Sequence, residues 1–353
     1  MNTRLTDAAK AALKDVTPPW SDRPLSASGA EVSVAGDKAT VVIETPREAG
    51  PAAEDVRLAA EAAVRAVSGI AEARAILTAH QSPASGGHAP LPTGRGAPKG
   101  PITLPGVKRV VAVASGKGGV GKSTVAANLA AGLARRGRRV GFLDADIYGP
   151  SAPTLFNLEG PPEIREEKIQ PLAAFGVKVL SIGFMIEPEK ALIWRGPMVM
   201  GAVSQLLGDA DWGELDALII DTPPGTGDAH LTLAQRAPLS GVLLVTTPQD
   251  LAYADARRSG KMFRRLSVPI LGVVENMAFL QGADGSLVRP FGEGGGARLA
   301  AEFEAPLIAS LPLDPALQKS GDDGAPLLAG DEDAPSRDAL ERVVDALEVF
   351  LEG

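Results

Sequence analysis

Cysteine is absent from this chain of 353 residues, and only three histidines are present. Without a thiol the chain can form no disulfide, perform no thiol catalysis and offer no thiolate to a metal. His80, His88 and His230 are scattered and show no metal-ligand spacing. The sequence therefore excludes a metal or cluster site built from this chain's own thiolates.

Long apolar runs are also absent, so no segment is predicted to span a bilayer. Residues 1–15 lack the apolar core of a signal peptide, and we expect a cytoplasmic protein that binds no membrane. A net charge of −8 argues against a broad nucleic-acid-binding face. Hydrophobic residues make up 45% of the chain, enough for packed cores, and the length suggests roughly two domains.

Residues 110–124, VVAVASGKGGVGKST, predict a nucleotide site. An apolar strand is followed by the spacing G-x-x-x-x-G-K-[ST] and then by a helical run. Glycines allow several N–H groups to converge on phosphate, Lys122 is expected to reach the β- and γ-phosphates, and Ser123 offers a hydroxyl to Mg²⁺. The predicted nucleotide-binding residues of this loop are Gly116, Lys117, Gly118, Gly119, Val120, Gly121, Lys122, Ser123 and Thr124.

Lys117 is a second lysine in this loop, which an ordinary phosphate-binding loop does not need. Because the loop backbone already cradles the phosphates, Lys117 is either a solvated surface charge or points at the nucleotide of another molecule.

Acidic residues end two further predicted strands. Residues 140–143 lead into Asp144 and Asp146, and residues 217–220 lead into Asp221. We expect Asp146 to orient or deprotonate the attacking water, Asp144 to help hold Mg²⁺ or its waters, and Asp221 to support the same ion. The alternative for Asp144 and Asp146 is a solvated pair that caps the next turn.

The C-terminal two thirds alternate strands and helices, which predicts an α/β fold with a doubly wound, mostly parallel sheet. Further strands are expected at residues 242–246, 270–274 and 307–311. Asn276 follows one of these strands, and its amide suits an adenine edge, although a turn residue is the alternative. We interpret His230 as a helix-cap or surface residue.

A small α+β domain is expected at residues 1–81, from an α-β-β-α-β order. Residues 82–106 are rich in Pro, Gly and Ser and predict a flexible linker, because this composition cannot bury enough surface to fold. Residues 107–353 then form the predicted ATPase domain.

The GKGGVGKST loop resembles the "deviant" Walker A loop of the class that includes Mrp/ApbC, MinD, ParA, ArsA and the nitrogenase iron protein. In that class the extra lysine, here Lys117, acts across a homodimer interface on the partner's ATP. Such a cation can be worth a ~10³–10⁵-fold rate increase. The class also implies that Asn276 reads the base.

Longer blocks narrow the resemblance to the Mrp/ApbC family, whose members are cytosolic ATPases that act as scaffolds or carriers in iron–sulfur cluster assembly. ParA and MinD proteins share the loop but not these later blocks. The resemblance implies ATP and Mg²⁺ as cofactors, a homodimer, and iron–sulfur assembly proteins or apo-protein clients as partners. The blocks lie at residues 144–156 (DADIYGPSAPTLF), 221–235 (DTPPGTGDAHLTLAQ), 275–280 (ENMAFL), 291–300 (FGEGGGARLA) and 311–327 (LPLDPALQKSGDDGAPL).

The sequence departs from the family's pattern at the place that binds the iron–sulfur cluster. Between residues 280 and 291 family members usually carry Cys-x-x-Cys, whereas this chain has glycines at Gly282 and Gly285. We therefore predict no iron–sulfur ligands in this chain and a mobile loop at this place. Two hypotheses follow: an ATP-gated dimer in cluster assembly whose cysteines come from a partner, or a cluster-less nucleotide-dependent switch of the ParA/MinD type.

Overall fold

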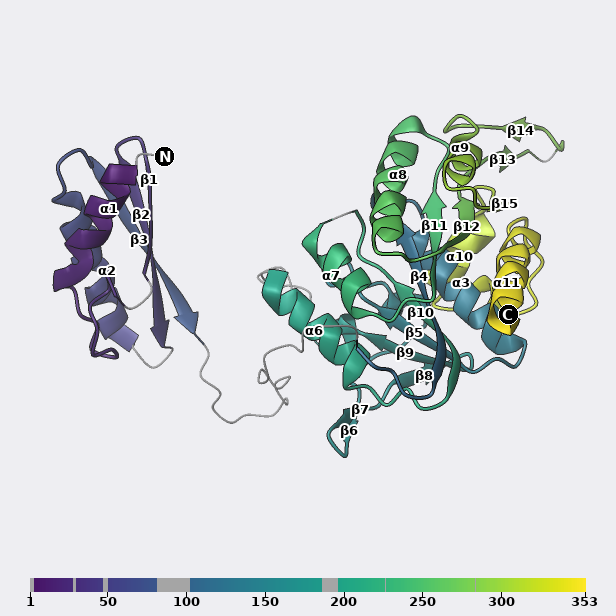
Figure 1. The fold of residues 1–353 in the computed structure, drawn as a ribbon, viewed down its shortest axis with the longest axis horizontal. Helices are drawn as coiled ribbons and strands as arrows, with labels where there is room; N and C mark the ends of the chain where they lie inside the picture. The colour runs from purple at the N-terminus through teal and green to yellow at the C-terminus, as the bar shows by residue number, and fades with distance from the viewer. Residues whose placement is uncertain are drawn as a thin grey trace. The chain divides into compact units, whose positions relative to one another are not determined.

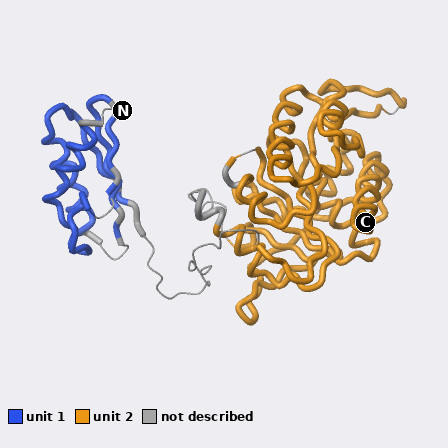
Figure 2. The backbone as a smooth tube through the Cα atoms, viewed as in Figure 1, with its two compact units in different colours: residues 1–92 blue, residues 93–353 orange. Residues whose placement is uncertain are grey.

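The computed structural model describes residues 3–27, 30–46, 50–80, 102–185, 196–225, 227–282 and 284–353. The chain forms two compact units, residues 1–92 and residues 93–353 (Figure 2). Residues 82–101 of the predicted linker lie outside the described residues, so the linker stays a prediction.

Two helices cover one face of a three-stranded sheet in the first unit (Figure 1). β1 and β2 are antiparallel, and β3 runs parallel to β2. Val41 and Ile43 lie two residues apart on β2 and are fully buried, as expected for one face of a strand. The elements are α1 (Thr3–Ala12), β1 (Glu31–Ala35), β2 (Lys38–Pro46), α2 (Gly50–Arg65) and β3 (Glu72–His80).

Eight strands form the sheet of the second unit, in the order β15-β12-β11-β4-β10-β5-β9-β8. Neighbouring strands are parallel except for the edge pair β8 and β9. The predicted doubly wound, mostly parallel sheet is thus confirmed. The strands are β4 (Val107–Ser115), β5 (Val140–Asp144), β8 (Leu172–Ala174), β9 (Val177–Ser181), β10 (Leu215–Asp221), β11 (Gly241–Thr246), β12 (Ile270–Glu275) and β15 (Leu307–Ser310).

Helices pack on both faces of this sheet (Figure 1). On β4, Val111 and Val113 face a core shared with α3 and α11, whereas Ala112 and Ala114 face a core shared with α8 and α9. The helices are α3 (Lys122–Arg135), α4 (Ala152–Leu155), α6 (Gly196–Gly208), α7 (Asp228–Arg236), α8 (Asp250–Arg265), α9 (Gly295–Glu302), α10 (Pro315–Asp322) and α11 (Arg337–Glu352).

Two small hairpins project from the second unit, β6 (Ile164–Arg165) with β7 (Lys168–Ile169), and β13 (Leu280–Gln281) with β14 (Leu287–Val288). Across the described part of the chain, no helix is both long and apolar enough to cross a bilayer.

Candidate nucleotide-binding site

The predicted phosphate-binding loop connects the C-terminal end of β4 to the N-terminus of α3. Gly119 and Gly121 have φ of +77° and +81°, a left-handed conformation that favours glycine. Ser115 Oγ donates to the carbonyl of Lys117 at 2.9 Å and fixes the start of the loop. Gly118 and Gly119 are exposed, so the backbone at the tip of the loop can be approached from solvent.

Two other glycines of the loop are required by close packing. A Cβ at Gly116 would lie 1.9 Å from the carbonyl carbon of Asp255 on α8. A Cβ at Gly121 would lie 2.1 Å from Asn276 Nδ2. Both distances are far below any real Cβ contact, so only glycine lets α8 and Asn276 pack against this loop.

Lys122, the first residue of α3, points back into the sheet edge. Its ammonium donates to Asp221 Oδ1, at the end of β10, and to Ser123 Oγ at 3.3 Å. The side chains of Lys122 and Asp221 are only 6% and 0% exposed. The pair is therefore an ion pair in a region of low dielectric, where a charged group needs its partner to stay buried.

Asp144 and Asp221 lie at matching positions on the adjacent strands β5 and β10. Burial and the nearby charge of Asp221 raise the pKa of Asp144 to about 7. Its carboxylate accepts four hydrogen bonds, from the backbone N–H groups of Asp146 (3.1 Å), Ser151 (2.9 Å) and Ala152 (3.0 Å) and from Ser181 Oγ (3.0 Å). The network fixes the turn after β5, so Asp144 also caps this turn.

Asp146 lies in that turn, at the same edge of the sheet. Its Oδ1 accepts a hydrogen bond from the Gly149 N–H at 3.3 Å. Burial raises its pKa, while the positive charge of Lys122 acts in the opposite direction. A carboxylate with a raised pKa is better suited to accept a proton near neutral pH than an ordinary aspartate.

Asn276 lies directly beneath the phosphate-binding loop. Its Nδ2 donates to the carbonyl of Val120 at 3.0 Å, and its Oδ1 accepts from the Met277 N–H at 2.9 Å. The side chain is 5% exposed. In this structure the amide therefore supports the loop from below, and the assignment of Asn276 to the adenine base stays a prediction.

Ser123 and Thr124 are partly buried at the start of α3, where the carbonyl of Thr124 accepts from Asn128 Nδ2 at 2.9 Å. Lys117 is partly exposed, and its ammonium forms no ion pair with any described residue. The loop's two lysines thus differ, because Lys122 is engaged with Asp221 and Lys117 is not.

The residues at this edge fit a magnesium ion. Asp221 Oδ2 is buried without a hydrogen-bond partner in the described structure. The Lys122 ammonium donates both to Asp221 Oδ1 and to the Ser123 hydroxyl. Oxygen ligands of this kind suit Mg²⁺, which takes one or two carboxylates and completes its shell with phosphate and water. Among the described residues, no group of three His, Cys, Asp or Glu side chains could hold a metal by itself.

The sequence predicts a cap or surface position for His230 of α7, and this prediction is wrong. The side chain is 1% exposed, and its ring lies edge-on to Phe263 of α8 with centroids 5.3 Å apart. Burial lowers its pKa to about 4, with the backbone of Gly225 partly opposing the shift, and neither ring nitrogen has a hydrogen bond of normal geometry to described residues. Helical spacing could have revealed this burial, since Leu233 and Ala234, three and four residues further along α7, are also buried.

The segment at the place of the family's Cys-x-x-Cys is the turn of the β13–β14 hairpin. Gly282 N donates to Ser286 O at 2.8 Å, and Gly285 N donates to Gly282 O at 2.9 Å. Asp284 Oδ1 accepts from Ser286 N at 3.0 Å. Hydrogen bonds within the segment shape this turn, and its predicted mobility stays a prediction; residue 283 itself lies outside the described residues.

Two family models match this chain. A ParA model described as an NUBPL iron-transfer P-loop NTPase matches residues 106–348. A model described as an iron–sulfur cluster assembly protein matches residues 6–75.

Relatives cover most or all of the chain. The iron–sulfur cluster carrier protein of Deinococcus radiodurans is 40% identical over 353 residues, which is 97% of this chain and 95% of that protein. The protein of the same description from Pseudomonas fragi is 52% identical over 236 residues, covering 66% of this chain and 82% of the relative.

Solved structures share the fold of the second unit. A nucleotide-binding protein from Archaeoglobus fulgidus in complex with ADP is 40% identical, with a TM-score of 0.57, and covers 64% of this chain and 90% of that one. The cell division ATPase MinD of Pyrococcus furiosus is 24% identical with a TM-score of 0.53, over 69% of this chain and 99% of that one, and shows the fold alone.

Proposed function

The chain belongs to the family of ParA-type iron-transfer P-loop NTPases, and we propose that it binds and hydrolyses ATP as a homodimer in iron–sulfur cluster assembly. The single observation that carries the nucleotide part is the buried pair of Lys122 and Asp221 beneath a glycine-rich loop at a helix N-terminus. This arrangement supports the proposal, because a cation, N–H donors and a carboxylate are the groups that a nucleoside triphosphate with magnesium needs.

Each residue of this edge has a distinct proposed task. Lys122 offsets the charge of the β- and γ-phosphates, and the backbone of residues 116–121 donates to phosphate oxygens. Ser123 and Asp221 would hold Mg²⁺, which neutralises charge on the phosphates when it is bound. Asp146, whose pKa is raised by burial, orients the attacking water and accepts its proton. Asp144 orders the turn that carries Asp146.

Lys117 is proposed to act on the nucleotide of a second copy. Its ammonium is not held by a carboxylate of the described chain, so it can be offered across an interface without breaking an ion pair. A cation that arrives from another subunit stabilises the charge of the transferring phosphoryl group. Hydrolysis is then tied to dimer formation.

The cluster is the cargo of this proposed function, and its ligands must come from other proteins. The chain has no cysteine, and the hairpin turn offers Asp284 as its ligand-type side chain, a hard oxygen donor that suits cluster iron poorly. We therefore expect iron–sulfur assembly proteins or apo-protein clients to supply the thiolates. The cytoplasm remains the predicted compartment, which cell fractionation would test.

An Asp146→Ala variant tests this proposal, because it should bind ATP, dimerise and stall before hydrolysis. We expect cysteine-bearing assembly proteins or apo-clients to co-purify with the stalled dimer and not with Lys122→Ala. Activities of iron–sulfur enzymes in a deletion strain should fall and be restored by the wild-type gene.

Anaerobic reconstitution with iron and sulfide, followed by iron and sulfide analysis, tests the ligand assignment. The purified homodimer should hold no stoichiometric cluster, and a stable cluster would refute this assignment. Unchanged iron–sulfur enzyme activities in the deletion strain would refute the role in cluster assembly and favour a cluster-less switch of the ParA/MinD type.

A further inference from the structure

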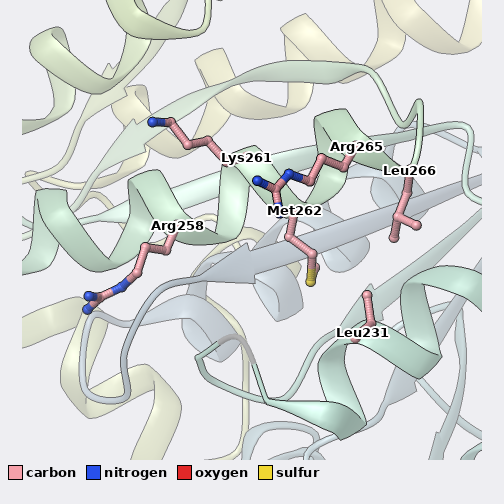
Figure 3. A pocket seen from close by; sticks show the side chains of 6 residues that line it. All are labelled: Leu231, Arg258, Lys261, Met262, Arg265 and Leu266. Atoms are coloured by element: carbon pink, nitrogen blue, oxygen red, sulfur yellow. The ribbon is translucent and has the colours of Figure 1, made fainter.

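A groove of about 520 Å³ runs between α7 and α8, and none of the residues that line it belongs to the phosphate-binding loop. Leu231 points into it from α7, and Met262 on α8 and Leu266, which directly follows α8, point toward Leu231 (Figure 3). The remaining lining residues, Arg258, Lys261 and Arg265, are all cations on α8. The groove thus combines an apolar floor with a positively charged rim.

The charge of this groove contrasts with that of the chain. The sequence carries a net charge of −8, yet no carboxylate lines the groove. Arg258 pairs with Asp255 on its own helix, and Lys261 lies 3.6 Å from Glu302. Arg265 is exposed and forms no ion pair with the described residues. Arg265 therefore keeps its full charge available for a partner, while Arg258 and Lys261 share theirs with carboxylates outside the groove.

We propose that this groove binds an amphipathic helix of a partner protein, with leucine-type residues on one face and acidic residues beside them. The apolar floor takes the leucine-type side chains, as in other helix-in-groove complexes, and the rim cations pair with the acids. The volume lies in the range of pockets that bury a few large side chains. Nucleic acid fits less well, because none of the lining residues is an aromatic platform for a base.

Both walls of the groove also contact the proposed nucleotide site, so occupancy should depend on nucleotide. α7 begins at Asp228, directly after the loop in which Gly225 N donates to Ser115 O at 3.3 Å. α8 packs against Gly116 through the backbone of Asp255. If nucleotide binding shifts the phosphate-binding loop or the loop before α7, one wall of the groove moves relative to the other. The dependence of groove occupancy on nucleotide rests on the proposed function.

The test uses the full-length protein and two labelled helical peptides of equal negative charge. One peptide carries leucine at positions i, i+3, i+4 and i+7 with glutamate between them, and the other has glutamine in place of each leucine. Fluorescence anisotropy is measured without nucleotide, with ADP and with a non-hydrolysable ATP analogue. We expect the leucine peptide to bind at least about tenfold more tightly than the glutamine peptide, with different affinities in the nucleotide states.

Substitutions in the rim test whether the leucine peptide binds in this groove. Lys261→Glu with Arg265→Glu should weaken leucine-peptide binding at least about tenfold, while Lys261→Gln with Arg265→Gln weakens it less. Arg342→Glu is the matched control, because Arg342 is an exposed helical arginine of α11 outside the groove and without an ion pair to described residues. It should bind as the wild type does.

The proposal is overturned if the two peptides bind equally or if the double variants bind like the wild type. It is also overturned if single-stranded DNA or anionic vesicles bind the wild type more tightly than the leucine peptide and lose affinity in the double variant. A double variant that abolishes dimerisation in sedimentation runs would make a second copy the occupant. Nucleotide affinity is titrated in parallel, so failure of the nucleotide site appears there and failure of the groove appears in peptide binding.

Discussion

The phosphate-binding edge and the β13–β14 hairpin both lie at sites that the sequence marks as functional, but they are built in opposite ways. At the edge, Lys122, Asp221 and Asp144 are buried and bonded to one another or to the backbone. In the hairpin, Leu280 and Val288 are 43% and 54% exposed, and the turn between the strands is held by its own backbone. One region is a preorganised polar site, and the other is a surface turn without soft ligands.

This difference separates two parts of the proposed function. Nucleotide chemistry needs charges fixed in a dry site, which requires a surrounding sheet and its helices. Cluster binding at a surface turn depends on thiolates that the turn itself carries, so the absence of cysteine here does not affect the rest of the fold. The chain can therefore keep the nucleotide part while depending on other proteins for the cluster.

The largest expected effect at the edge comes from Lys122→Ala. Removing this ammonium should lower Mg-ATP affinity by at least about 100-fold, because the charge that offsets the phosphates is lost and Asp221 is left buried without its partner. Isothermal titration measures this, with Asp284→Asn in the exposed hairpin as the control. Unchanged affinity in Lys122→Ala would show that the site lies elsewhere.

Lys117→Ala, whose expected effect falls on turnover and not on affinity, separates the two lysines of the loop. It should bind ATP as the wild type does and lose turnover by ~10³-fold, because the cation is proposed to act only on the nucleotide of the partner subunit. Steady-state phosphate release as a function of protein concentration measures the effect. Full turnover, or wild-type activity from a strict monomer in light scattering, would contradict the proposed role.

The buried side chain of His230 predicts that the free energy of unfolding depends on pH, with an effect of intermediate size. His230 has a pKa lowered from 6.5 to about 4 by burial, so the unfolded state takes up its proton first as pH falls. Its contribution to the free energy of unfolding is complete above pH 6.5 and is lost by about pH 4, an effect of at most about 3 kcal/mol.

Urea unfolding of the wild type and His230→Leu at several pH values between 7 and 4 measures this difference. The variant should lose less stability on acidification, whereas Asp284→Asn in the hairpin should follow the wild type. Parallel stability curves for the wild type and His230→Leu would contradict the assignment of the pH dependence to this side chain.

The smallest effect compares one glycine from each region. Gly121 and Gly285 have nearly equal φ of +81° and +82°. A Cβ at Gly285 meets nothing within 4 Å, so Gly285→Ala should cost about 1 kcal/mol from backbone strain alone. Gly121→Ala should cost more, because its Cβ would lie 2.1 Å from Asn276 Nδ2. Equal losses of unfolding free energy would show that the packing under the loop is loose.

The same strain bears on restoring the family's cysteines. Gly282→Cys places its Cβ 2.6 Å from Ser286 Oγ, the end of a side chain that can rotate away. Gly285→Cys must adopt the left-handed conformation. The doubly substituted turn therefore has the right spacing but not a relaxed backbone, which the sequence alone could not indicate.

Local sequence patterns predicted much of the fold. Apolar runs that end in Asp, and a glycine-rich loop before a helix, predicted β4, β5, β10 and α3 together with their shared edge. The strands β8 and β9 were missed, because they are short and their sequences, LAA and VKVLS, have no strong pattern. β9 is placed in the sheet by its pairing with β5 on one side and β8 on the other, and its β5 partners, such as Val140 for Val177, lie far away in sequence.

The sequence by itself determined the loop, the acids at the strand ends and the absence of thiolates, because each follows from residue type and spacing within a short segment. Only the tertiary structure decided that Asn276 supports the loop from below, that His230 is buried, and that three cations line an apolar groove between α7 and α8. These features depend on which helix faces pack together, and burial and partners are set by neighbours distant in sequence.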